Sequence, residues 1–510
     1  MLDSFLSIVI FSPLLGMIAL IFIPREKEAA LKAAGIFGTL LPLLLSFYLY
    51  GHFLGGGRLD LFSVKTSWIQ LGNAGAAQSG LFAVDYELAL DGFSLLMVLL
   101  TALLSTLAAI ASLHIKKEWK GYFLLFLVLE AGMLGVFMAQ NLILFFIFFE
   151  ITLIPAFFLI GKWGYAEKEK AAYSFLIYNG LGSAVLLIAI IVLFARTGTS
   201  NIDGLRYLMN TDGAELVSPI TEGMKYGLLA ALLVAFGVKL PIFPLHTWML
   251  RVHVQAPPAI VMLHAGILLK IGAFGLIRFG MGIFPQQFKE LAVIISVLGV
   301  INLLYGAFLA MIQREFKLVL AYSSISHMGI VLIGLGALNE SGLQGAAFQV
   351  ISHGLIAALL FFLVSVMYER LQTTSLITLG GLSQAMPVTA GFLLAGALAS
   401  LGLPGMSGFV SEFLAFLGLF KRDPLLAAIG ALGIILTAVY LLRAVMGINF
   451  GKKGVAVRKG AVADISELEW VPALVLTAAV ILIGVYPAVL GSPLKDTVDF
   501  IMAGLGGGRG

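Results

Sequence analysis

The sequence predicts an all-α polytopic membrane protein with about fourteen transmembrane helices, each of about 20 apolar residues. Of its 510 residues, 60% are hydrophobic and only 11% are charged. Soluble globular proteins average about 25% charged residues, so this composition excludes a soluble fold. Two of the apolar runs are interrupted by proline and glycine, which indicates broken helices.

The apolar runs give the predicted spans in chain order. They are 4–23, 31–54, 83–112, 121–139, 141–161, 171–196, 224–249, 256–280, 288–311, 317–336, 342–368, 386–420, 424–450 and 468–490. The first run lacks a preceding basic segment, so we expect a retained span rather than a signal peptide. The stretches 55–82 and 197–223 are polar and glycine-rich, and they predict loops outside the membrane. No linker divides the chain, so we expect residues 1–510 to form a single membrane domain.

The distribution of lysine and arginine predicts the orientation. If the N-terminus lies outside, the loops on the cytoplasmic side hold most of the 31 basic residues. The positive-inside rule then places both termini on the outer side. The net charge of +4 indicates no nucleic-acid partner, because the basic residues lie in short loops between apolar runs.

The two broken spans are the seventh and the twelfth. Proline and glycine interrupt them at 238–244 and at 401–408. Proline removes a backbone donor, and the freed carbonyl groups must then face protein or water. Each break lies beside a charge, Lys239 or Glu412. Paired breaks five spans apart are typical of transporters with inverted repeats, whereas the alternative is that each break merely kinks a helix.

Ionisable side chains lie inside the predicted spans. A charge at the bilayer centre costs about 2.5–3.5 kcal/mol on insertion scales, so such residues are usually functional. Acids and bases at this depth predict a path for protons or cations. The candidate residues are Glu130, Glu150, Lys239, Lys270, His327, His353 and Glu412.

The local sequences suggest how some of these residues work. Glu150 lies in the middle of its span, and Lys239 is its expected partner in a buried ion pair. Lys270 lies far from both ends of the eighth span, which argues against snorkelling to the surface. His327 and His353 are flanked by serines, which favours a hydrated relay over isolated core histidines. A protonated glutamic acid bonded to the helix backbone is the alternative for Glu150.

The sequence suggests different roles for two further acids, Glu130 and Asp91. Glu130 lies inside a predicted span, and its neighbours in the sequence indicate no particular role. Asp91 precedes a helix, and an N-terminal capping role explains it well. No histidine or carboxylate spacing indicates a metal site. The chain has no cysteine, which excludes disulfides, thiolate metal sites and iron–sulfur ligation. It also lacks a phosphate-binding loop and a dinucleotide fingerprint, so we expect no cofactor in this chain.

Several motifs in the correct order resemble the antiporter-like subunits of respiratory complex I, the NADH–quinone oxidoreductase. The motifs occupy 149–155, 238–246, 255–257, 265–270, 326–329 and 403–409. The similarity covers about residues 80–450. It implies a fold with two inverted five-helix repeats, 121–280 and 288–450, which provide two half-channels for protons.

The resemblance also implies the roles of individual residues. These are the coupling ion pair Glu150 and Lys239, the central lysine Lys270, the relay histidines His327 and His353, the terminal carboxylate Glu412 and the fourth-span acid Glu130. The implied reaction is NADH oxidation by quinone, which drives protons outward across a bacterial plasma membrane or its organellar equivalent. NADH, FMN, the iron–sulfur clusters and quinone would bind other subunits of the complex, and neighbouring antiporter-like subunits would be the partners.

Two positions refine the resemblance. Glu412 stands where related branches carry lysine, which resembles the M-type branch that includes mitochondrial subunit 4. Arg251 stands where the family usually has an acid, at the expected cytoplasmic mouth. That departure leaves three alternatives open: a subunit of a multi-subunit sodium/proton antiporter, a subunit of a membrane hydrogenase or of an oxidoreductase with another electron donor, and a structural scaffold.

Overall fold

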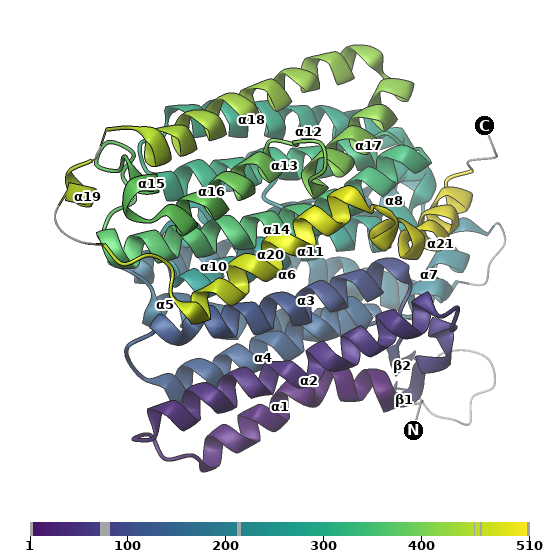
Figure 1. The fold of residues 1–510 in the computed structure, drawn as a ribbon. Coiled ribbons are helices and arrows are strands. Elements are labelled where there is room, and N and C mark those ends of the chain that lie inside the picture. The colour runs from purple at the N-terminus through teal and green to yellow at the C-terminus, as the bar shows by residue number, and fades with distance from the viewer. Residues whose placement is uncertain (1–3, 72–81, 212–215, 453, 459–461, 507–510) are drawn as a thin grey trace.

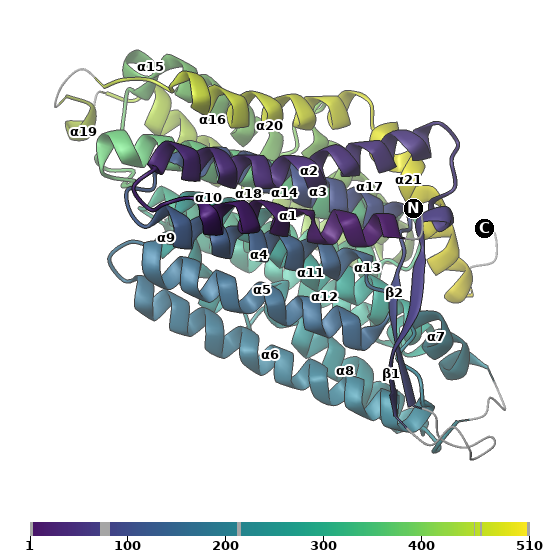
Figure 2. The same ribbon diagram turned by 90° about the horizontal axis from the view of Figure 1, so that it is seen from below.

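The computed structural model describes residues 4–71, 82–211, 216–452, 454–458 and 462–506. Its helices run side by side along one common direction (Figures 1 and 2). We call one end of the bundle the hairpin end, because it carries β1 (Val64–Leu71), β2 (Phe82–Leu88), α7 (Ile202–Asn210) and α21 (Ala488–Gly504). The opposite end is the lysine-rich end, with Lys116, Lys117, Lys162 and Lys168.

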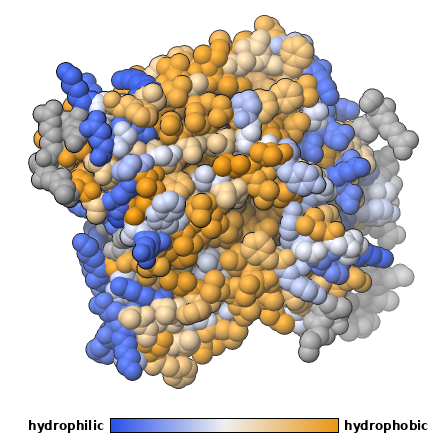
Figure 3. Space-filling view, in the orientation of Figure 1, coloured by the Kyte–Doolittle hydropathy of each residue, from blue (hydrophilic) through white to orange (hydrophobic). Residues whose placement is uncertain are grey.

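Twelve helices among the described residues are long and apolar enough to cross a membrane. They are α1 (Phe5–Phe22), α2 (Glu28–Leu54), α3 (Gly92–Ala111), α4 (Trp119–Met138), α5 (Leu142–Trp163), α6 (Lys168–Thr197), the continuous helix Pro258–Met281, α12 (Pro285–Ile312), α13 (Phe316–Gly336), α14 (Glu340–Leu371), α18 (Pro424–Phe450) and α20 (Glu467–Val485). Each coincides with a predicted span. On the face seen in Figure 3, hydrophobic side chains cover the middle and hydrophilic ones gather at both ends.

The two remaining predicted spans are broken, as the sequence predicts. The seventh consists of α8 (Glu222–Lys239) and α9 (Thr247–Gln255), and the twelfth of α16 (Pro387–Ser400) and α17 (Ser407–Arg422). With the twelve continuous helices they complete the predicted set. Short helices complete the described elements: η2 (Leu59–Phe62), η3 (Ser112–His114), α15 (Leu382–Ala385) and α19 (Val455–Arg458).

The predicted loops contain more structure than expected. The third span begins at Gly92 rather than at residue 83, because the preceding segment forms β2, which pairs antiparallel with β1. Part of the predicted loop 197–223 forms α7, and α21 follows the last span without having been predicted. Residues 72–81 and 212–215 of the two loops lie outside the described part. The capping role of Asp91 is confirmed, since its carboxylate accepts from the Ser94 amide at 2.7 Å.

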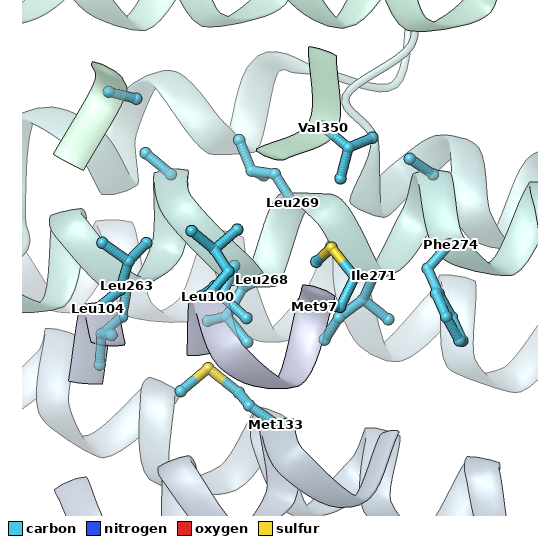
Figure 4. Packing of buried hydrophobic residues seen from close by; sticks show 14 of the residues in the cluster. Met97, Leu100, Leu104, Met133, Leu263, Leu268, Leu269, Ile271, Phe274 and Val350 are labelled. Atoms are coloured by element: carbon cyan, nitrogen blue, oxygen red, sulfur yellow. The ribbon is translucent and has the colours of Figure 1, made fainter. Parts of the chain in front are cut away.

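The most deeply buried spans lie in the centre of the bundle. The helix Pro258–Met281 and α14 are buried along their most apolar stretches, whereas only a third of the corresponding stretches of α1, α2, α18 and α20 is buried. Figure 4 shows Leu268, Ile271 and Phe274 packed among Met97 and Leu100 of α3. The two central helices also carry Lys270 and His353, and apolar packing therefore encloses both polar groups.

A glycine sets the distance between α14 and α17. A Cβ atom at Gly345 would lie 2.3 Å from the backbone nitrogen of Ala415, so a larger residue there would push the two helices apart. This close approach brings α17, which carries Glu412, against the polar side chains of α14.

Two β-bridges occupy corresponding places in the chain. Asn141, at the start of α5, bridges to Asn201, which follows α6. Glu315, at the start of α13, bridges to Ser375, which follows α14. Both bridges tie the start of one span to the segment that follows the next span.

Candidate functional site

The break in the seventh span holds Lys239 inside the bundle. It is the last residue of α8, and only 2% of it is exposed. Its Nζ lies 4.7 Å from the ring centroid of Phe149 and 5.7 Å from that of Phe175. The aromatic faces stabilise the ammonium group by cation–π attraction.

Glu150 does not contact Lys239 directly. No ion pair within 4.0 Å joins the two among the described residues, and Glu150 Oε1 has no hydrogen-bond partner. The predicted pair is therefore separated in this structure, and the ammonium group lies on aromatic rings instead.

Lys270 contacts the second half of the chain. It is fully buried, and its Nζ lies 2.7 Å from His353 Nδ1 and 3.7 Å from Met328 Sδ. The turn before it, His264–Leu268, is a π-helix, and such turns often mark functional sites. Lys270 and His353 can therefore exchange a proton directly.

From His353, polar groups continue to Glu412. The rings of His353 and His327 lie 5.4 Å apart between centroids. His327 Nε2 lies 3.2 Å from Ser400 Oγ, and its Nδ1 lies 3.5 Å from Glu412 Oε1. Gln349 donates from Nε2 to the same Nδ1 atom at 3.1 Å. All of these groups are buried, so they form one polar path through an apolar bundle.

Glu412 lines a cavity of about 400 Å³ together with Gly402 and a group of phenylalanines, and only 6% of the residue is exposed. The path from Lys270 thus ends at a buried carboxylate beside this cavity.

Sequence reasoning missed three contributors to the site. Gln349 accepts a hydrogen bond from Ser411 while it donates to His327. His253 and His264 form a buried histidine pair with 2.9 Å between Nε2 and Nδ1. His264 lies six residues before Lys270 on the same helix, and both residues are buried.

Glu130 is fully buried, and neither carboxylate oxygen has a hydrogen-bond partner. No direct contact joins it to the other predicted site residues in the described part of the chain. Its role therefore remains a prediction from the sequence.

Arg251 lies exposed on α9, close to the lysine-rich end. A hydrogen bond from Lys170, with a smaller contribution from the charge of Arg251, lowers the pKa of the Glu167 carboxyl group. Arg251 therefore adds positive charge at this end. Within the described residues, no group of three or more histidine or carboxylate side chains could hold a metal ion.

Residues 139–437 match the family described as NADH:quinone oxidoreductase/Mrp antiporter, TM. The NAD(P)H-quinone oxidoreductase chain 4 2 of Thermosynechococcus vestitus is 42% identical over 413 residues, which cover 80% of this chain and 76% of the relative. The NADH-quinone oxidoreductase subunit M of Rhodobacter capsulatus is 35% identical and covers 98% of this chain and 97% of its own length.

Solved structures show the same architecture. A chain of respiratory complex I from Thermus thermophilus with bound NADH superposes with a TM-score of 0.83 at 29% identity, over 98% of this chain and all of that chain. A chain of an archaeal membrane-bound sulfane sulfur reductase gives a TM-score of 0.83 at 26% identity, over 96% of this chain and 77% of its own. A chain of the Mrp complex from Dietzia shares the fold at 21% identity and a TM-score of 0.82, over 99% of each chain.

Proposed function

Because this chain belongs to the NADH:quinone oxidoreductase/Mrp antiporter family of membrane proteins, we propose that it is a proton-translocating, antiporter-like subunit of an NADH–quinone oxidoreductase. The observation that carries the proposal is the buried path from Lys270 through His353 and His327 to Glu412. Every member of this path can take up and release a proton.

The mechanism is electrostatic. Lys270 passes a proton to His353 Nδ1, His353 passes one to His327, and His327 passes one to Glu412. A signal from neighbouring subunits closes or opens the pair of Glu150 and Lys239, and the charge of Lys239 then favours or opposes a proton on Lys270. The separated pair in this structure corresponds to the open arrangement of that switch.

The two-repeat organisation, 121–280 and 288–450, belongs to the same proposal. The bridges Asn141–Asn201 and Glu315–Ser375 support it. In each proposed repeat, the bridge joins the turn between the first and second helices to the segment that follows the third helix. The first bridge lies at the hairpin end, because Asn201 donates a hydrogen bond to Glu87 of β2. An inverted repeat requires the second bridge at the opposite end.

We place the chain in a bacterial plasma membrane, with both termini on the outer side and the lysine-rich end in the cytoplasm. The positive-inside rule supports this orientation, as does the position of α21 beside the hairpin at the end where α1 begins (Figure 2). NADH, FMN, iron–sulfur clusters and quinone bind other subunits in this proposal, and the partners include neighbouring antiporter-like subunits.

A second candidate is a subunit of an oxidoreductase with another electron donor. The likeness to a membrane-bound sulfane sulfur reductase chain supports it, as does the cation at position 251. The purified, tagged chain distinguishes the two. Co-purifying NADH–quinone reductase activity supports complex I, whereas a clean complex without such activity contradicts it.

Removal of the lysine at the broken seventh span tests the mechanism. We expect Lys239→Ala to abolish proton pumping while the complex still assembles. Normal pumping by that variant would contradict the electrostatic scheme.

A further inference from the structure

We infer that His253 and His264 form a proton wire that links the cavity at the lysine-rich end to Lys239 and Lys270. The inference rests on the proposed function and adds two proton-carrying residues to it. Neither histidine was among the residues predicted from the sequence to lie on the path.

The geometry of the pair suits proton transfer. Both side chains are about 1% exposed, and His253 Nε2 lies 2.9 Å from His264 Nδ1. The outer nitrogens, His253 Nδ1 and His264 Nε2, are buried without a hydrogen-bond partner. Buried polar atoms rarely stay unpaired without a functional reason. The two rings thus present one shared hydrogen bond in the middle and one free nitrogen at each end.

Such a pair moves a proton without changing its own net charge. A proton that binds His253 Nδ1 allows the Nε2 proton to pass to His264 Nδ1. His264 then releases a proton from Nε2, so one proton enters and one leaves. Rotation of the rings or return of the protons resets the pair.

The inner end, His264, shares a helix with Lys270 and an aromatic neighbour with Lys239. The ring of His264 contacts Phe175 at 5.9 Å between centroids, and Phe175 also lies under the Lys239 ammonium group. The π-helical turn that contains His264 leads directly into the turn with Lys270.

The outer end lies next to a cavity at the lysine-rich end. The ring of His253 packs on Phe361 of α14 at 4.9 Å. One helical turn farther along α14, Ser365 lines a cavity of about 300 Å³. Pro257 and Pro258, just after the helix that carries His253, line the same cavity. His253 is therefore connected to this cavity through its neighbours in the chain and on α14.

The alternative is that the pair only supports packing, since both rings lie among aromatic side chains. Glutamine separates the two views, because its amide can hydrogen-bond but cannot take up and release a proton at neutral pH. The test uses His253→Gln, His264→Gln and the double variant, in vesicles that hold the complete complex. Assembly, quinone reduction and proton pumping are measured together, and pumping is recorded over a range of pH.

We expect each single variant to assemble and to pump about tenfold more slowly or worse, because a positioned proton-transfer group contributes about 10²–10⁴-fold. Its pH profile should differ from that of the wild type, which lost packing alone would not cause. Because the two rings act in series, the double variant should pump like the slower single variant. The matched control is His52→Gln, at the hairpin end of α2, which should pump like the wild type.

Lys270→Ala separates this inference from the proposed function. Normal pumping by Lys270→Ala would overturn the proposed function. Loss of pumping in Lys270→Ala, with wild-type rate and pH profile in either histidine variant, would overturn the wire alone. If His264→Gln fails to assemble, His253→Gln and His264→Asn carry the same test, and normal pumping by either one overturns the wire.

Discussion

Replacement of Glu412 by glutamine should stop proton pumping while the fold is kept. Glu412 Oε1 lies 3.5 Å from His327 Nδ1. At an effective dielectric constant of about 20, opposite unit charges at that separation attract by about 5 kcal/mol. Glutamine removes this attraction, so a proton on His327 loses its stabilisation. Since about 1.4 kcal/mol corresponds to a factor of ten in rate, the pumping rate should fall by far more than tenfold.

The assay measures proton uptake by vesicles that hold the assembled complex, at equal quinone-reductase content. Glu412→Lys should also fail, because it places a cation beside His327. Lys421→Gln, a change at an exposed position on the same helix α17, is the control and should pump normally. Wild-type pumping by Glu412→Gln would refute the assignment of this carboxylate as the end of the path.

Three further predictions concern the surroundings of the path. Gln349→Leu should impair pumping, measured as protons per electron, because leucine loses both the hydrogen bond that positions His327 Nδ1 and the one from Ser411. Arg370→Ala should destabilise the protein by about 3–5 kcal/mol, since it leaves Glu469 buried without its bidentate cation; thermal unfolding of the purified complex measures the loss. Burial raises the pKa of the Asp464 carboxyl group, but hydrogen bonds from the first turn of α16 outweigh it and hold this pKa below its usual value. Its contribution to stability is therefore present above about pH 4 and lost as pH falls through the lowered pKa, so the unfolding temperatures of wild type and Asp464→Asn should differ at pH 7 and converge in acid.

The sequence was sufficient to predict the spans and their breaks. A helix that crosses lipid needs about 20 apolar residues, and proline ends or bends a helix. The local composition is therefore enough to predict the spans and their breaks. The breaks at Lys239 and Glu412 were predicted for the same reason, because a charge beside proline and glycine is conspicuous in an apolar run.

The contacts between helices could not be predicted. The His253–His264 hydrogen bond joins residues of two separate helices, eleven positions apart, and no local sequence signal marks that contact. The separation of Glu150 from Lys239 depends on the aromatic rings that receive the ammonium group. The strand β2 was missed because its apolar residues were assigned to the start of the third span, although Asp85 and Glu87 interrupt them.

The hydrogen bond between Lys270 and His353 joins the two proposed repeats. Lys270 belongs to the segment 121–280 and His353 to the segment 288–450, and their side chains meet at 2.7 Å in the centre of the bundle. In the proposed mechanism, a proton crosses from one half-channel to the other through this contact. The contact is a single hydrogen bond between two side chains, and the helices that carry them are closely packed. A small rotation of the Lys270 side chain would therefore break it without unfolding either half. A pump needs such a junction, because protons must not run freely from one side of the membrane to the other.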